Sequence, residues 1–375
     1  MADPAAAAHA ACAIVRVEVY GYDLTYAHGA YVMSGGRTLT ALPSTVVRVV
    51  TADGVAGYGE ACPLGTRYLP AFAEGARAAL RQIAPAVIGV DATDLGAVAD
   101  AMDAALLGHG YAKSPVDIAC WDILGRPTEM PVCALGAESF PLYAAVPLAA
   151  AAETAEFVRD RMTDGVRRFQ MKLGADPSDD AARTAEVSRL VGDEAIVIAD
   201  ANCGWVLQDA VVAARLLDGL DRVYLEQPCR TLEACVAVRG HTTLPMILDE
   251  IILDVPSLIR AVRANALEAF NVKIGRVGGL TNARLLRDLA ERLGLRVTIE
   301  DSWGGDVTTA AVAHLAASTR PENLLTVSFM NDWTREHVAG YQPRSRDGVG
   351  TAPTGPGLGI DVDVGALGAP LFVVD

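Results

Sequence analysis

The stretch Ala195-Ile-Val-Ile-Ala-Asp200 is a short apolar run that ends on a charged residue, and other runs of the chain are built alike. Such runs also end at Lys172, Glu226, Asp249 and Lys273, so that charged residues recur at intervals of roughly 25 residues. Each interval has room for one helix and two turns, which is the period of a repeated strand-helix unit. A closed parallel barrel would bring these side chains to one mouth.

Other apolar runs precede and follow these. We expect strands at residues 143–148, 168–173, 195–200, 222–226, 246–249, 269–274, 296–300 and 324–329. Helical periodicity lies between the strands, at residues 178–191, 208–218, 255–264, 280–292 and 306–317. Repeated units of a strand followed by a helix predict a (β/α)8-type TIM barrel over residues 139–345.

The chain before the barrel has a different pattern. Residues 14–20, 44–50 and 55–60 are predicted to form a three-stranded antiparallel meander, and helical patterns follow between residues 68 and 135. Together they predict an α+β N-terminal capping domain, a meander plus helices, over residues 13–138. The flanking segments are expected to be a loose tail at residues 1–12, a mobile loop from Tyr26 to Arg37, and a Gly- and Pro-rich C-terminal segment, residues 346–375, that packs back on the capping domain.

Composition and charge exclude several classes of protein. The 375 residues are 51% apolar, enough for a barrel of about 250 residues and a second domain. The net charge of −15 would repel a nucleic-acid backbone, and no apolar run is long enough to span a membrane. The first residues lack the basic region of a signal peptide, and the seven cysteines show no Cys-x-x-Cys spacing. We therefore expect a soluble, cytoplasmic protein with reduced thiols that binds neither nucleic acid nor membranes.

The three carboxylates of the series suggest a metal site. Asp200, Glu226 and Asp249 would lie at the carboxyl ends of consecutive barrel strands, where catalytic groups of such barrels collect. Hard oxygen ligands without thiols or imidazoles favour Mg²⁺, or Mn²⁺, over zinc. A divalent ion would also offset the repulsion among clustered carboxylates. Any one of these acids alone could instead cap a helix, but the periodic set favours metal binding.

The two lysines lie on the strands that flank the carboxylates. Lys172 and Lys273 stand in strand-like contexts, Phe-Gln-Met-Lys-Leu and Phe-Asn-Val-Lys-Ile, where a lysine has little reason to be unless it has a function. One amine on each side of a substrate α-carbon suits proton abstraction next to a carboxylate through an enediolate. We expect a neighbouring cation and desolvation to lower a lysine pKa toward about 7–8. The alternative is a surface lysine whose ammonium reaches the solvent.

These residues carry a resemblance to a known family. The carboxylate series and the stretch Val272-Lys-Ile-Gly-Arg-Val-Gly-Gly279 resemble the enolase superfamily, in its mandelate racemase and muconate lactonizing enzyme group. The resemblance covers essentially the entire chain, including Gly57-Tyr-Gly-Glu60 at the end of the meander. It implies a homo-oligomer, up to an octamer, that acts on a small-molecule carboxylate with Mg²⁺. It assigns the metal to Asp200, Glu226 and Asp249, and acid/base chemistry to Lys172 and Lys273.

Three segments resemble proteins that act on proline derivatives. They are Ala112-Lys-Ser-Pro-Val-Asp-Ile-Ala-Cys-Trp-Asp122, Tyr68-Leu-Pro70 and Glu300-Asp-Ser-Trp-Gly-Gly-Asp306. The proteins in question are cis-3-hydroxy-L-proline dehydratases and epimerases of proline betaine or hydroxyproline betaine. One position departs from the family, because Gln170 stands where the first lysine of a Lys-x-Lys pair is usual. The family's second lysine transfers the proton, so Lys172 keeps the base, whereas a neutral amide replaces the charge beside the substrate carboxylate.

Further residues are candidates for binding and support. Asp301 and Trp303 could hold a substrate ammonium by charge and cation–π contact, although a loop acid and a packing indole are equally compatible with the pattern. Tyr26 and His28 lie in the expected loop and could close over the substrate, against the default of a solvated loop. The residues expected to orient the metal ligands are Asn202 and Glu250.

The favoured function is Mg²⁺-dependent abstraction of an α-proton, followed by loss of the β-hydroxyl of cis-3-hydroxy-L-proline or a similar proline derivative. Lysines on both faces also permit an amino-acid or proline-betaine racemase or epimerase, which would exchange the α-proton without elimination. A muconate-type cycloisomerase and a non-catalytic barrel are weaker alternatives. Gln170 is the one feature that favours the non-catalytic barrel, and loss of metal binding by a folded protein would support it.

Overall fold

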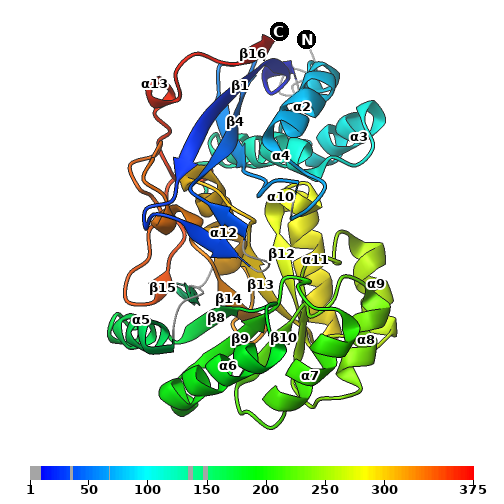
Figure 1. Ribbon diagram of the computed structural model, residues 1–375. Coiled ribbons are helices and arrows are strands. Elements are labelled where there is room, and N and C mark those ends of the chain that lie inside the picture. The colour runs from blue at the N-terminus through cyan, green and yellow to red at the C-terminus, as the bar shows by residue number, and fades with distance from the viewer. Residues whose placement is uncertain (1–9, 34–36, 67, 134–137, 147–150) are drawn as a thin grey trace.

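The computed structural model describes residues 10–33, 37–66, 68–133, 138–146 and 151–375. Figure 1 shows two parts stacked on each other, an N-terminal sheet with helices and a barrel with its helices around it. Parts of three expected elements lie outside the described residues: most of the N-terminal tail, the tip of the loop at Ser34 to Gly36, and the end of the first barrel strand after Val146.

The capping domain contains the predicted antiparallel meander. Strands β1 (Ile14–Thr25), β4 (Ala41–Thr51) and β5 (Ala56–Ala61) are neighbours, and β16 (Phe372–Val374), near the C-terminus, pairs with β1 as a fourth strand. Helices α2 (Ala73–Val87), α3 (Leu95–Ala105) and α4 (Gly110–Gly125) complete the domain. The segment expected to be an irregular loop contains a short hairpin, β2 (Tyr31–Met33) with β3 (Arg37–Leu39).

The barrel has eight parallel strands in chain order, as predicted. They are β7 (Ala144–Val146), β8 (Arg168–Lys172), β9 (Ile196–Asp200), β10 (Val223–Glu226), β11 (Met246–Leu248), β12 (Ala269–Lys273), β13 (Arg296–Glu300) and β14 (Leu324–Val327). Leu142, just before β7, forms a parallel bridge with Val327 of β14, which closes the ring. The first and last strands of the sheet are therefore joined, and the ends of all eight strands face a common mouth.

Helices follow seven of the eight strands. They are α5 (Ala151–Thr163), α6 (Pro177–Val191), α7 (Leu207–Leu217), α8 (Leu232–Arg239), α9 (Val255–Arg263), α11 (Leu280–Leu293) and α12 (Asp306–Ala317). A one-turn helix, α10 (Ile274–Val277), directly follows β12. After β14 the chain forms a 3₁₀ helix, η3 (Met330–Trp333), in place of an α-helix. Helices α5 and α8 were not among the helical stretches named from the sequence.

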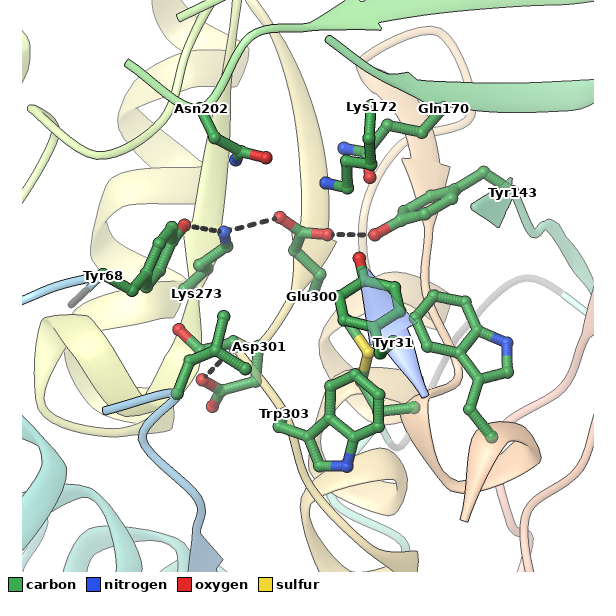
Figure 2. A pocket seen from close by; sticks show the side chains of 14 residues that line it. Tyr31, Tyr68, Tyr143, Gln170, Lys172, Asn202, Lys273, Glu300, Asp301 and Trp303 are labelled. Atoms are coloured by element: carbon green, nitrogen blue, oxygen red, sulfur yellow. Dashed lines mark hydrogen bonds and ion pairs between the residues drawn. The ribbon is translucent and has the colours of Figure 1, made fainter. Parts of the chain in front are cut away.

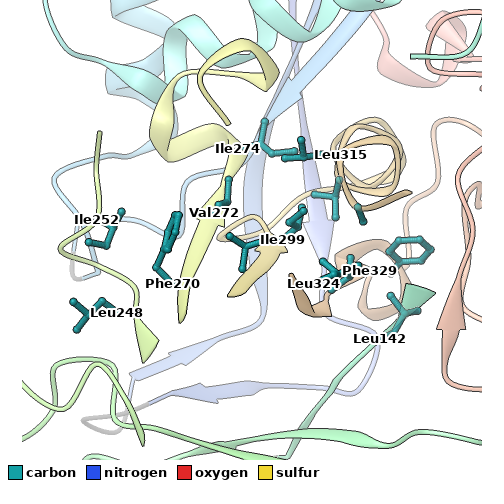
Figure 3. Close-up of a cluster of buried hydrophobic side chains, with 14 of the residues drawn as sticks. Leu142, Leu248, Ile252, Phe270, Val272, Ile274, Ile299, Leu315, Leu324 and Phe329 are labelled. Atoms are coloured by element: carbon teal, nitrogen blue, oxygen red, sulfur yellow. The ribbon is translucent and has the colours of Figure 1, made fainter. Parts of the chain in front are cut away.

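Alternation along the strands separates the apolar core from the polar mouth. Ile196 and Ile198 of β9 belong to a cluster that fills the barrel interior, and Asp200 continues the same inward face at the strand end. On β12, Phe270 and Val272 belong instead to the larger core under the helices (Figure 3). Burying one such apolar side chain contributes about 1.5–3 kcal/mol. The inward face therefore changes from an apolar floor to charged groups at one end.

Contacts of β5 hold the capping domain over this mouth. Glu60 is fully buried and accepts hydrogen bonds from the backbone N–H groups of Gly305 and Thr308, at the N-terminal end of α12. Gly57 and Gly59 lie against α4, where a Cβ atom would collide with the carbonyl oxygens of that helix. The strand can approach α4 this closely because glycine has no side chain.

The cysteines are free thiols, two of which lie in the loops beside the barrel mouth. Cys203 follows β9 and Cys229 follows β10. Within the described residues, no helix has both the length and the apolar character needed to span a lipid bilayer.

Candidate active site

Strand register brings the predicted charged residues together. Lys172 of β8 pairs with Asp200 of β9, which pairs with Glu226 of β10, so the three form one row. Asp249 lies directly after β11, and Lys273 ends β12. All five side chains are buried. Because β8 and β12 are the second and sixth strands of an eight-stranded barrel, Lys172 and Lys273 stand on opposite sides of the mouth.

Two of the three carboxylates, Asp200 and Asp249, are paired with cations. Lys172 Nζ lies 2.6 Å from Asp200 Oδ2, and Lys273 Nζ lies 2.7 Å from Asp249 Oδ2. Arg276, on α10, lies 2.8 Å from the other oxygen of Asp249. Burial alone would raise the pKa of Asp249, but the two cations hold it below its usual range.

Glu226 lies between the two ion pairs, and its hydrogen-bond donors within the described residues are neutral amides. Asn271 Nδ2 donates to it over 2.7 Å, and Gln170 Nε2 over 3.2 Å. Burial raises its pKa well above the usual range, and the negative charges of Asp200 and Asp249 raise it further. Asp200 and Asp249 each contact a lysine ammonium, whereas the groups that donate to Glu226 are uncharged.

The donor set fits a hard divalent cation by its chemistry and charge. Six buried carboxyl groups gather at the mouth: Asp200, Glu226, Asp249, Glu250, Glu300 and Asp301. Among the described residues, the buried cations beside them are Lys172, Lys273 and Arg276. Glu250 Oε2 and Asn202 Oδ1 are buried and have no hydrogen-bond partner in the part of the chain that the structure describes. Within the described ranges, no three His, Cys, Asp or Glu side chains form a group that could hold a metal in the present arrangement, in which Lys172 donates to Asp200 and Lys273 to Asp249.

The expected lowering of the lysine pKa values is wrong for this arrangement. Burial alone lowers the pKa of Lys172, but the charge of Asp200 more than offsets this effect and raises it above the usual range. The same holds for Lys273, whose pKa is raised by Asp249 and Glu300, although Arg276 acts in the opposite direction. Each ammonium is therefore stabilised by the carboxylate that faces it.

A small pocket separates the two lysines. Its volume is about 30 Å³, which is enough for ordered water. Figure 2 shows Lys172 and Gln170 on one side and Lys273 with Tyr68 on another, with Glu300 between Lys273 and Tyr143.

Aromatic rings form the remaining wall of the pocket. The ring centroid of Trp303 lies 5.3 Å from that of Tyr31 and 5.8 Å from that of Trp333. Tyr143 lies 6.4 Å from Trp333 on the far side. Asp301 also lines the pocket and accepts hydrogen bonds from the backbone N–H groups of Ser302 and Gly275. Burial raises the pKa of Asp301 to about 7 despite these bonds.

The other predicted site residues divide into two groups. Asn202 lines the pocket, donates to Glu250 Oε1 over 3.1 Å, and has its backbone N–H 2.8 Å from Asp200 Oδ1. Tyr26 and His28 line a neighbouring cavity of about 840 Å³. Among the described residues, neither belongs to the lining of the pocket between the lysines. Tyr26 reaches the aromatic wall from behind, 5.6 Å from Tyr31 between ring centroids.

Sequence reasoning missed several residues of the site. Glu300 ends an apolar run as the five charged residues do, so the same periodicity could have identified it. Arg276 follows Lys273 closely in the chain, but nothing in the pattern directs it toward Asp249. Tyr68 comes from the capping domain, and no spacing relates it to the barrel strands. Tyr143 begins the run predicted as the first barrel strand, whereas the periodicity directs attention to the ends of such runs.

Comparison with known proteins identifies relatives over nearly the full length. Residues 153–366 match the family described as enolase C-terminal domain-like. Residues 22–136 match the mandelate racemase / muconate lactonizing enzyme N-terminal domain. A cis-3-hydroxy-L-proline dehydratase of Roseibium aggregatum is 40% identical over 362 residues, covering 96% of this chain and 98% of the relative.

Two further relatives are a racemase and an enolase-superfamily protein of known structure. An N-succinyl-L-Arg/Lys racemase of Bacillus cereus is 27% identical over 82% of this chain and 85% of its own length. The crystal structure of an enolase-superfamily member from Roseovarius nubinhibens, complexed with magnesium, superposes with a TM-score of 0.91. It is 34% identical and covers 97% of this chain and 99% of that one.

Proposed function

This chain belongs to the mandelate racemase and muconate lactonizing enzyme group of the enolase superfamily, and we propose that it dehydrates cis-3-hydroxy-L-proline or a closely similar cyclic amino acid. The observation that carries the proposal is the pair of buried lysines on opposite sides of one pocket, next to three carboxylates. The 40% identity to a dehydratase of that substrate supports the choice of reaction.

Mg²⁺, or Mn²⁺, is the proposed cofactor, and Asp200, Glu226 and Asp249 are the proposed ligands. Glu226 is buried beside the negative charges of Asp200 and Asp249, which raise its pKa, and a bound cation would offset them. The magnesium in the structure of a relative also supports this choice. When bound, the ion would neutralise the substrate carboxylate and the negative charge that develops on it. Asn202 would orient Asp200 through its backbone N–H, which donates to Asp200 Oδ1, and its side-chain amide donates to Glu250.

The lysines are the proposed acid and base. One lysine takes the proton from the α-carbon, and the electron pair of that C–H bond moves toward the carboxylate to form an enediolate. The electrons then return to form a carbon–carbon double bond as the β C–O bond breaks, and the hydroxyl takes a proton from a lysine ammonium and leaves as water. The remaining enamine tautomerises to a cyclic imine. No oxidant or reductant is needed.

The aromatic wall is the proposed site for the substrate ring and its nitrogen. Tyr31, Trp303 and Trp333 present ring faces within contact of one another, and Asp301 adds a carboxylate at the same side of the pocket. A secondary ammonium is stabilised by both kinds of group. Gln170 is proposed to face the substrate carboxylate from the Lys172 side.

The test is to incubate the purified protein with Mg²⁺ and cis-3-hydroxy-L-proline in D₂O and follow the reaction by proton NMR. Dehydration predicts loss of the substrate signals and appearance of the cyclic imine. Absence of imine with a folded, metal-loaded protein would rule the proposal out.

The second candidate is racemisation or epimerisation at the same carbon. It is favoured by the placement of lysines on both sides of the pocket and by the relationship to a racemase. The same spectra distinguish it, because deuterium would enter the α-position with inversion and without elimination.

A further inference from the structure

Tyr143 and Glu300 form a buried pair inside the pocket to which no role has been given so far. The Tyr143 hydroxyl donates to Glu300 Oε2 over 2.5 Å, and Asn271 Nδ2 donates to the other oxygen over 3.1 Å. Both members line the pocket and are at least nine-tenths buried. Burial, followed by the charge of Glu300, raises the pKa of Tyr143 well above its usual range, so its hydroxyl remains a hydrogen-bond donor.

This pair contacts one lysine of the site and not the other. Lys273 Nζ lies 3.3 Å from Glu300 Oε1 (Figure 2). It also lies 2.7 Å from Asp249 Oδ2. In the described part of the chain, the one carboxylate within ion-pair distance of Lys172 is Asp200. The two lysines, equivalent in the sequence pattern, thus have unequal surroundings.

This difference between the lysines matters because Asp200 and Asp249 are proposed metal ligands, whereas Glu300 is not. Asp200 and Asp249 belong to that set, so an ion would share the oxygens that now face the lysines. Glu300 is outside the set, and its two oxygens are already oriented by Tyr143 and Asn271. Lys273 therefore retains a fixed carboxylate partner in the loaded site, whereas Lys172 does not.

We propose that Glu300, held by the hydroxyl of Tyr143, is the positioning residue for Lys273 and governs proton transfer on that face of the substrate only. The inference rests on the proposed function, because it assigns separate faces of one α-carbon to the two lysines. The pair acts through Lys273, by fixing the direction from which its nitrogen approaches the substrate.

The experiment compares Y143F and E300Q with the wild-type enzyme, with Mg²⁺, in two measurements. The first is α-proton exchange in D₂O of cis-3-hydroxy-L-proline and, separately, its α-epimer, trans-3-hydroxy-D-proline. The variants K172A and K273A first identify which lysine serves which epimer. We expect E300Q to slow exchange on the Lys273 face about 100-fold, and Y143F about tenfold, with the other face changed less than about threefold.

The second measurement does not depend on catalysis. Both lysines are labelled with acetic anhydride, and their rates of modification are read by peptide mass spectrometry. We expect Lys273 to be labelled severalfold faster in both variants, and Lys172 at the wild-type rate. The control is Y224F, which removes a tyrosine hydroxyl bonded to Arg296 at the amino-terminal end of the barrel strands and should leave both measurements unchanged.

The outcomes separate this inference from the proposed function. Equal losses on both faces, or unchanged labelling of Lys273, would overturn the positioning role. If the wild-type protein exchanges neither epimer, the proposed function fails. The labelling result then decides independently whether Glu300 and Tyr143 hold Lys273.

Discussion

The two sides of the pocket between the lysines are assembled in different ways. The charged side comes from consecutive strands β8 to β12, each of which contributes one residue at or just after its end. The aromatic side comes from separate segments: Tyr31 from a hairpin of the capping domain, Tyr143 from before β7, Trp303 from after β13 and Trp333 from η3. In the proposed function, the first side would transfer a proton at the α-carbon of a carboxylate substrate, and the second would determine which molecule fits.

The largest expected effect comes from removing a carboxylate on the charged side. E226Q would keep the shape of the side chain and the donation from Asn271, but would remove a negative charge from the proposed metal site. We expect Mg²⁺ binding, measured by calorimetry, to weaken strongly and α-proton exchange to fall about 1000-fold. The matched control is E268Q, at the amino-terminal end of β12, which should bind Mg²⁺ as the wild type does. Normal binding by E226Q would contradict the assignment.

A smaller and selective effect is expected on the aromatic side. Trp333 is partly exposed, so W333L should leave the fold intact while removing one ring face from the pocket. Loss of a partly desolvated cation–π contact predicts a KM about tenfold higher for the cyclic amino acid, with kcat changed much less. Steady-state kinetics check this expectation, with W121F on α4 as the control. A fall in kcat at unchanged KM would place Trp333 in the chemistry and blur the distinction between the two sides.

The smallest expected effect concerns Gln170, which lies on the charged side but is itself neutral. Q170K would place an ammonium where the amide now donates to Glu226. If this position faces the substrate carboxylate, the added charge should lower KM by about threefold. A raised KM, measured under the same conditions, would show that the new ammonium competes for Glu226 and does not contact the substrate.

The charged side and the fold could be predicted because both depend on local periodicity. Apolar runs ending in Asp200 or Lys273 indicate strands, and parallel strands in sequential order have their ends at one mouth. The position of β16 beside β1 and the hairpin that carries Tyr31 depend on contacts between distant segments, which no repeat encodes. The domain boundaries, the homo-oligomer and the cytoplasmic location remain predictions.

The electrostatic state of the lysines could not be predicted for a related reason. The sequence places Lys172 one strand away from Asp200, but only the strand register shows that the two are direct partners. The same register pairs Lys273 with Glu300, which creates the difference between the two lysines. A pKa depends on such distances of a few ångströms, and residue spacing along the chain does not determine them.

The central claim is that a divalent ion and the two lysines act together on one α-carbon. The most direct test is to titrate metal-stripped enzyme with Mg²⁺ in D₂O and measure the rate of α-proton loss from cis-3-hydroxy-L-proline. The account predicts no loss without the ion and a rise that saturates at one Mg²⁺ per subunit. Proton loss at the full rate in the presence of a chelator, or none at saturating Mg²⁺, would contradict it.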